Sequence, residues 1–143
     1  MIMSKVFNTK TGSILLGNVT FSAGMRLEEL LESGVVIDRV LDMKTGWVFR
    51  TTGPYDIADR KVYVSLEFLR NSLKRVGFSF CDGPPLKPEA RFPEHTEFLE
   101  RELGQPDRRT SEDVIYDFAW GTISSGLDLR GSSAQVLCAW NAP

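Results

Sequence analysis

The feature that most constrains the fold of this chain is a strict alternation of apolar and polar residues between positions 61 and 80. Val62, Val64, Leu66 and Phe68 alternate with Lys61, Tyr63, Ser65 and Glu67, and beyond Asn71-Ser72 the apolar set resumes at Val76, Phe78 and Phe80. Side chains along a strand point to opposite faces with a period of two, so this pattern predicts a β-hairpin with one buried face. Tyr63 and Glu67 should then point outward.

Other stretches also read as strands. Residues 4–21 carry apolar positions around the turn-forming segment 8–12 and predict two short strands. Residues 35–52 are rich in β-branched and aromatic side chains around a turn at 44–46, and they predict strands that end in a loop at 52–55. Residues 114–140 alternate again and predict two or three antiparallel strands.

Two short helices are expected between these strands. Residues 22–34 place a candidate N-cap before three leucines on one helical face, Leu27, Leu30 and Leu31, and end in a glycine. Residues 94–103 space three side chains by four, His95, Leu99 and Leu103, and a glycine and a proline then stop the helix. Together the patterns predict an α+β protein with an antiparallel β-sheet covered by two short helices.

The segment 81–93 holds four of the chain's seven prolines, so we expect neither helix nor sheet to run through it. The predicted organisation is a first α+β section at 1–83, a proline-rich joint at 84–93 and a second α+β section at 94–143, packed as one compact unit. Each section has a helix followed by strands. The two sections are therefore either similar helix-then-sheet halves or a coincidence of architecture.

Charge and cysteine usage exclude several classes of protein. The formal net charge is −2, and the local basic group at Arg70, Lys74 and Arg75 is typical of a solvated edge of a strand or turn, so nucleic acid is not an expected partner. The sequence lacks a signal-peptide pattern and an apolar run long enough to cross a membrane, which favours a cytoplasmic location without membrane contact. Cys81 and Cys138 are then expected to be reduced thiols.

The sequence offers little for catalysis. The single histidine, His95, lies in line with Leu99 on a helical face, and no nucleophile-elbow motif surrounds the serines near Gly121. One histidine and two distant cysteines cannot supply a zinc site, and no glycine loop for phosphate is present, so we expect no cofactor and no enzymatic activity. One enzymatic alternative stays open: Asp117 and Asp128 would have to converge within about 10 Å around a cleft.

Binding is better supported, because amphipathic aromatic residues dominate protein interfaces. The residues that could provide such anchors are Trp47, Trp120, Trp140, Tyr55, Tyr63 and Tyr116, although any one of these rings more often fills the core or covers the sheet. The candidate protein-binding residues are Asp117, Trp120, Asp128, Arg130, Tyr63 and Glu67.

Two resemblances point in the same direction. The stretches Phe98-Leu-Glu-Arg-Glu-Leu-Gly-Gln-Pro and Val114-Ile-Tyr-Asp-Phe-Ala-Trp-Gly resemble the repeat unit of the beta-lactamase inhibitor protein fold and its small lipoprotein relatives. The stretch Trp120-Gly-Thr-Ile-Ser-Ser-Gly-Leu-Asp-Leu-Arg resembles small bacterial immunity proteins, which neutralise toxins of neighbouring cells. Both resemblances imply a protein that binds another protein and blocks it.

The leading hypothesis is therefore a protein-binding inhibitor of the immunity type that acts by occlusion, with a toxin as partner. The alternative is a small-ligand-binding or accessory domain, which would need a deep pocket lined by Phe68, Phe78, Phe118 and Trp120. The oligomeric state is left open by the sequence, although an exposed edge strand at Val136–Trp140 would invite dimerisation.

Overall fold

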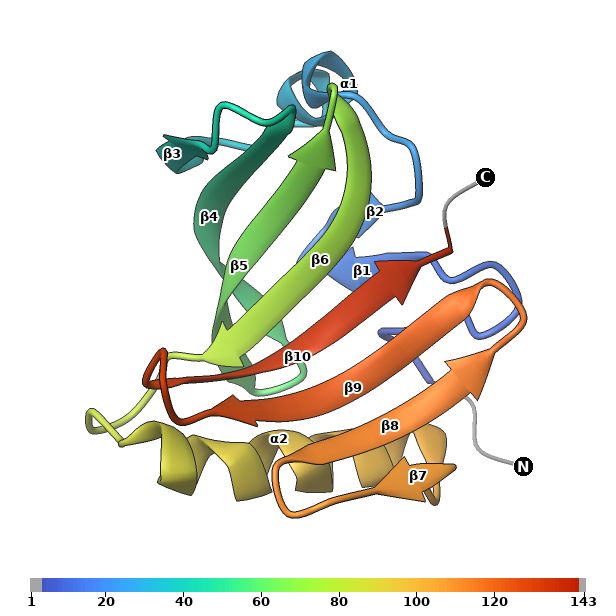
Figure 1. Ribbon diagram of the computed structural model, residues 1–143, viewed down its shortest axis with the longest axis vertical. Helices are drawn as coiled ribbons and strands as arrows, with labels where there is room; N and C mark the ends of the chain where they lie inside the picture. The colour runs from blue at the N-terminus through green and yellow to red at the C-terminus, as the bar shows by residue number, and fades with distance from the viewer. Residues whose placement is uncertain (1–3, 142–143) are drawn as a thin grey trace.

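One eight-stranded antiparallel sheet runs through the computed structural model, which describes residues 4–141 (Figure 1). The strand order β3-β4-β5-β6-β10-β9-β8-β7 consists of two meanders that meet where β10 pairs with β6. The strands are β3 (Ile37–Asp42), β4 (Trp47–Ile57), β5 (Arg60–Leu69), β6 (Ser72–Phe80), β7 (Arg108–Arg109), β8 (Asp113–Phe118), β9 (Gly121–Asp128) and β10 (Ser133–Trp140). An antiparallel sheet with two helices agrees with the predicted α+β class, but the sheet is larger than the sequence patterns suggested, and α2 (Pro88–Leu103) is the helix that packs on it.

The alternating hairpin at 61–80 is confirmed as β5 and β6. Its apolar set is buried to the last member, and the two strands pair antiparallel from Val62 opposite Phe80 onward. The turn is centred on Arg70 and Asn71, which have positive φ angles of 49° and 64°, as a tight hairpin turn requires. The Asn71 side chain also accepts a hydrogen bond from the Leu27 N–H at 3.1 Å, so this turn holds the start of the first helix.

Helix α1 (Leu27–Glu32) is short and buries less than expected. Leu30 is fully buried, but Leu31 is 49% exposed, so the three leucines do not share one buried face. The reason is geometric, because neighbouring helical positions lie about 100° apart and a six-residue helix can press only a narrow stripe onto the core.

The N-terminal strands are confirmed with a different turn. Strands β1 (Ile14–Leu16) and β2 (Val19–Phe21) form a separate two-stranded sheet around residues 17–18. The segment 8–12 instead makes the preceding turn, which is closed by a bridge between Phe7 and Ile14. The expected loop at 52–55 is wrong: β4 continues through it with a bulge between Thr52 and Tyr55, because a bulge can absorb a proline within a strand.

Helix α2 (Pro88–Leu103) starts six residues earlier than the sequence pattern indicated. The expectation that no helix enters 81–93 is therefore wrong, because Pro88 occupies the first helical position, where a missing amide costs nothing. Arg91, in the added turns, is buried and donates to the Glu94 carboxylate at 2.9 Å and to the Asp82 carbonyl at 2.8 Å. These contacts anchor the proline-rich loop to the helix.

The two faces of the sheet differ. Helix α2 packs against β6, β9 and β10, and the N-terminal strands lie on that same side, behind the sheet in Figure 1. The face turned towards the viewer carries no other element of the described chain. The core lies between α2, the N-terminal strands and the covered face, with His95, Phe98 and Leu99 of the helix fully or almost fully buried.

Strand β10 is a central strand, so the exposed edge expected at Val136–Trp140 is wrong; the edges are β3 and β7. Cys81 and Cys138 are both free thiols, as expected. Within residues 4–141, no helix is both long and apolar enough to cross a membrane.

Candidate functional site: the uncovered sheet face

The uncovered face is built by the residues that alternate with the buried ones. A row of paired residues crosses six strands from β4 to β8: Phe49, Glu67, Arg75, Ala139, Thr122 and Asp117. Neighbouring strands lie about 4.8 Å apart, so Glu67 and Asp117 are about 20 Å from each other along this row. The face is therefore a continuous surface of mixed chemistry with the dimensions of a protein interface.

One end of the row holds a compact charged and aromatic cluster. Arg75 forms an ion pair with Glu67 at 2.8 Å, and its guanidinium lies 4.8 Å from the centre of the Trp47 ring. The Glu67 side chain is only 16% exposed, and burial raises the pKa of its carboxyl despite the attraction of Arg75. A half-desolvated ion pair stacked on an aromatic ring is typical of interface hot spots.

Tyr63 lies on the same face, where its hydroxyl donates to the carboxylate of Asp38. This hydrogen bond raises the pKa of the Tyr63 phenol. The predicted pair Tyr63 and Glu67 thus shares one face, as the alternation required.

Asp117 and Asp128 do not converge. Asp117 pairs with Thr122 at one end of β9, and Asp128 lies six residues further along that strand, about 20 Å away. Asp117 is held by Arg108 through two hydrogen bonds of 2.7 and 2.9 Å, which lower the pKa of its carboxyl. Asp128 accepts the Gly131 N–H and closes the β9–β10 turn, which also contains Arg130. The separation removes the geometric basis of the two-carboxylate enzyme.

Trp120 lies at the β8–β9 turn, apart from the uncovered row. Its ring stacks on Phe118 with 4.9 Å between centroids, and its indole N–H donates to the Thr9 carbonyl at 2.8 Å. Trp120 is therefore partly buried against the core, which leaves less of its ring for contact with a partner. Asp117 lies near Trp120. Neither the strand register nor a hydrogen bond brings Trp120 close to the other predicted contact residues, Asp128, Arg130, Tyr63 and Glu67.

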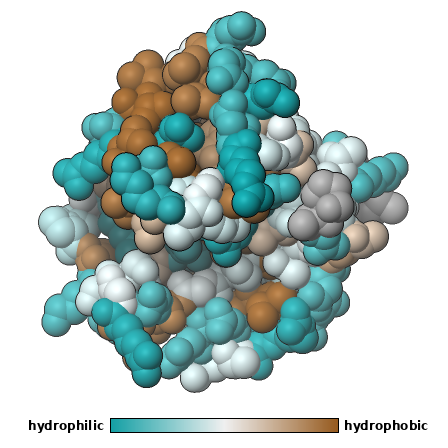
Figure 2. Space-filling model, turned by 45° about the horizontal axis from the view of Figure 1, so that its top comes forward, coloured by the Kyte–Doolittle hydropathy of each residue, from teal (hydrophilic) through white to brown (hydrophobic). Residues whose placement is uncertain are grey.

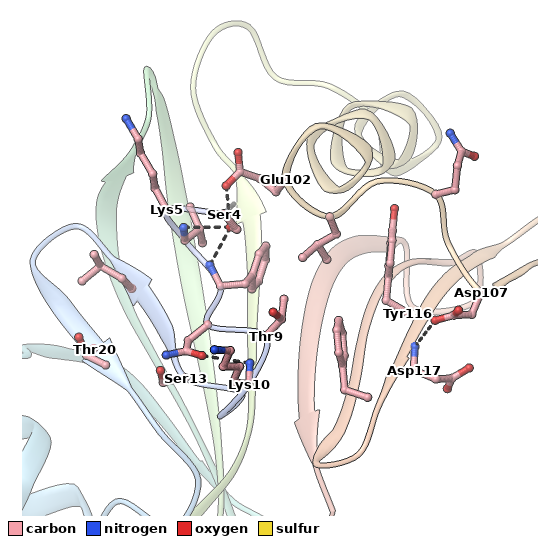
Figure 3. Close-up of a pocket in the computed structure, with 17 residues that line it drawn as sticks. Ser4, Lys5, Thr9, Lys10, Ser13, Thr20, Glu102, Asp107, Tyr116 and Asp117 are labelled. Atoms are coloured by element: carbon pink, nitrogen blue, oxygen red, sulfur yellow. Dashed lines mark hydrogen bonds between the residues drawn. The ribbon is translucent and has the colours of Figure 1, made fainter. Parts of the chain in front are cut away.

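A second concave feature lies at the edge of the molecule. A cleft of about 780 Å³ separates the N-terminal segment from β8 and the end of α2. Figure 3 shows Ser4, Thr9, Lys10 and Ser13 on one wall and Asp107, Tyr116 and Asp117 on the other. The cleft is lined by polar side chains on both walls, among them Asp117, which is paired with Arg108, and Phe7 and Phe118 add apolar surface.

The pocket expected between sheet and helices is absent where Phe68 and Phe78 lie, because both rings are fully buried among core side chains. Of the four residues named for it, only Phe118 lines the cleft.

His95 is a core residue in this structure. It is fully buried, and its Nε2 accepts the Phe80 N–H at 3.1 Å, while burial lowers the pKa of the imidazole to about 4. Among residues 4–141, no group of three or more His, Cys, Asp or Glu side chains could hold a metal ion.

Comparison of the chain with protein-family models, curated proteins and solved structures finds no match, so function has to be argued from the site alone.

Arg75 is not among the contact residues predicted from the sequence, and Trp47 enters only as one of the aromatic residues that could provide an anchor. The sequence favours a solvated edge of a strand or turn for Arg75, which the structure places on β6. The hairpin pattern also contains its partner: if Leu66 faces Val76, the next residue, Glu67, faces Arg75. Opposite charges at directly facing strand positions are the signal that would have identified this pair.

Proposed function

We propose that this protein is a non-enzymatic, protein-binding inhibitor of the immunity type, which acts in the cytoplasm and occludes a toxin with the uncovered face of its sheet. The observation that carries the proposal is the Glu67–Arg75–Trp47 cluster on a sheet face that no element of residues 4–141 covers. Glu67 is already partly desolvated before any partner binds, so the further cost of burying it in an interface is reduced.

The chemistry of the face supports this role. Four of the six predicted contact residues, Tyr63, Glu67, Asp117 and Asp128, lie on strands of this sheet at positions that alternate with the buried set. Glu67 and Asp117 are paired with Arg75 and Arg108, so the face presents charges of both signs, and a partner with complementary charges would associate faster. Occlusion requires only a surface that matches the partner. It needs no pair of converging carboxylates, and Asp117 and Asp128 lie near opposite ends of β9.

The test is a binding and protection assay with the products of neighbouring genes. A toxin among them should form a stable one-to-one complex, and co-expression should restore growth. Tyr63→Ala and Glu67→Ala should each weaken the complex at least about tenfold, which corresponds to about 1.4 kcal/mol. Glu97→Ala is the matched control, because Glu97 is exposed on α2, on the opposite side of the sheet.

Two outcomes would count against the proposal. If no neighbouring gene product binds, or if Glu97→Ala weakens the complex as much as the sheet variants do, the uncovered face is not the inhibitory surface. Circular dichroism of each variant shows whether a loss of binding is merely a loss of fold.

The cleft favours a second candidate function, the binding of a small ligand. Its polar lining and the rings of Phe7 and Phe118 suit a polar molecule with an aromatic or aliphatic part. Aromatic amino acids and dipeptides are suitable probes, and a ligand at a hundred times its Kd should stabilise the protein by about 2.7 kcal/mol in thermal unfolding. If the panel neither stabilises the protein nor shifts amide NMR signals around the cleft, this function loses its support.

A further inference from the structure

The two edges of the sheet are protected very differently. Strand β7 is two residues long, and both are exposed arginines, which discourage pairing with another strand. Strand β3 is six residues long and contains no proline; it carries charges at Asp38, Arg39 and Asp42, but exposed apolar residues lie within it and at both of its ends. Val36 is 77% exposed, Val40 59%, Leu41 58% and Met43 44%. Figure 2 shows hydrophobic surface gathered on the upper part of the molecule, where Figure 1 places α1 and β3.

The backbone of β3 is available for pairing. The Met43 N–H donates to the Trp47 carbonyl at 3.0 Å, so Met43 turns its backbone groups towards β4. Because these groups alternate along an antiparallel strand, Val40 and Asp42 turn theirs to the open side. The bulge in this strand lies between Ile37 and Arg39, at its beginning, and leaves the remainder straight enough to pair.

We propose that β3 pairs with β3 of a second copy of this chain, antiparallel and across a two-fold axis at Leu41. In this register Leu41 faces Leu41 of the partner subunit, and Val40 and Asp42 exchange backbone hydrogen bonds with the partner's Asp42 and the partner's Val40. Arg39 faces the partner's Met43. Apolar contact thus lies on the axis, and no like charges face each other on either side of it.

Charge selects this register over its neighbours. An axis at Asp42 would place that carboxylate directly opposite the partner's Asp42. An axis at Val40 would bring Asp42 of the partner subunit to the bulge, where Asp38 carries a second carboxylate. Like charges at facing strand positions are destabilising, so both shifts are disfavoured. The remaining register is self-complementary, which is what a second copy requires and an unrelated strand would not.

The symmetry has a consequence for the shape of the assembly. A two-fold axis between antiparallel edge strands is perpendicular to the sheet, so both uncovered faces lie on the same side of one continuous sheet. The dimer would present two copies of the Glu67–Arg75–Trp47 cluster side by side. The pairing itself stands on the edge strand and is independent of the inhibitory role proposed above.

A single edge strand buries less than the roughly 1,600 Å² of a standard interface, so we expect a dimer that forms at micromolar concentrations. Sedimentation velocity over about 1 to 500 μM, a range that brackets such affinities, should show the mass rising from 16.1 kDa towards twice that value. Leu41→Lys places two ammonium groups at the axis and should raise the dissociation constant of the dimer at least about tenfold. Leu129→Lys is the matched control, because Leu129 is 54% exposed in the β9–β10 turn, away from β3.

A second variant tests the register without relying on loss of association. In a Cys81→Ser background, Leu41→Cys should crosslink across the axis under mild oxidation, because non-hydrogen-bonded antiparallel partners lie at a Cα separation that fits a disulfide. Met43→Cys should not crosslink, since it would face Arg39 of the partner subunit.

The proposal is overturned if the wild-type protein stays monomeric up to the highest concentration, or if Leu41→Lys dimerises as well as Leu129→Lys. It is also overturned if Leu41→Lys leaves a monomer unchanged but abolishes a complex with a different protein, which would assign the edge to a foreign strand. Crosslinking through Met43→Cys alone would refute the register.

Discussion

Acidification from pH 7 to pH 5 should destabilise this protein through His95, its single histidine. The imidazole is fully buried, and burial lowers its pKa from the ordinary 6.5 to about 4, with Glu94 partly opposing the shift. Between these two values the unfolded chain binds a proton that the folded protein excludes. Stability is therefore complete above the unfolded pKa and falls as the pH drops from about 6.5 towards 4.

The magnitude follows from the two pKa values. At pH 5 the unfolded imidazole is almost fully protonated and the folded one is almost neutral. This pH lies about 1.5 units below the ordinary pKa, and each unit costs about 1.4 kcal/mol, so the free energy of unfolding should fall by about 2 kcal/mol relative to pH 7. For a protein of ordinary stability this is a large fraction of the free energy of unfolding.

The assay is urea unfolding, followed by tryptophan fluorescence, of the wild type and His95→Gln at pH 7 and pH 5. Glutamine keeps an acceptor for the Phe80 N–H but does not titrate. Glu67, whose pKa is raised by burial, contributes with the opposite sign, but it does so equally in both proteins. The wild type should lose about 2 kcal/mol more than the variant between the two pH values. Parallel losses in the two proteins would refute the reasoning.

Three further results are expected. Gly12→Ala should destabilise the protein strongly, because a Cβ there would lie 2.6 Å from the Trp120 ring at a φ of +83°; chemical denaturation measures the loss, and an unchanged midpoint would contradict the packing. Asp82→Asn should lower the free energy of unfolding, measured with urea at pH 7, by about 1 kcal/mol, because Arg60 holds the pKa of this carboxyl at about 2. The difference from the wild type should vanish as the pH falls from 4 towards 2 and the carboxyl is protonated in both states. Cys138 should stay unreactive towards a thiol reagent until the protein unfolds, because burial raises the pKa of its thiol to about 12; rapid modification of two thiols in the native protein would show that the core opens.

The candidate site could be derived from the sequence only in part. The alternation at 61–80 placed Tyr63 and Glu67 outward, since strand periodicity is a local property. The partner of Glu67, by contrast, depended on the hairpin register, and the approach of Asp117 to Asp128 depended on which ends of two strands meet. The sequence predicts Trp120 as a surface contact residue. Its hydrogen bond to Thr9 joins residues more than a hundred positions apart, and no local pattern could predict that contact.

The amino-acid sequence by itself determined that antiparallel strands dominate the protein and which side chains of the hairpin at 61–80 are buried, because those properties follow from the period of neighbouring residues. Only the tertiary structure decided that β10 lies in the centre of the sheet, that β3 is an open edge and that one face has no cover. Strand order is set by contacts between residues distant in the chain, and no local pattern records them. The surfaces proposed here for inhibition and for dimerisation both belong to this second group.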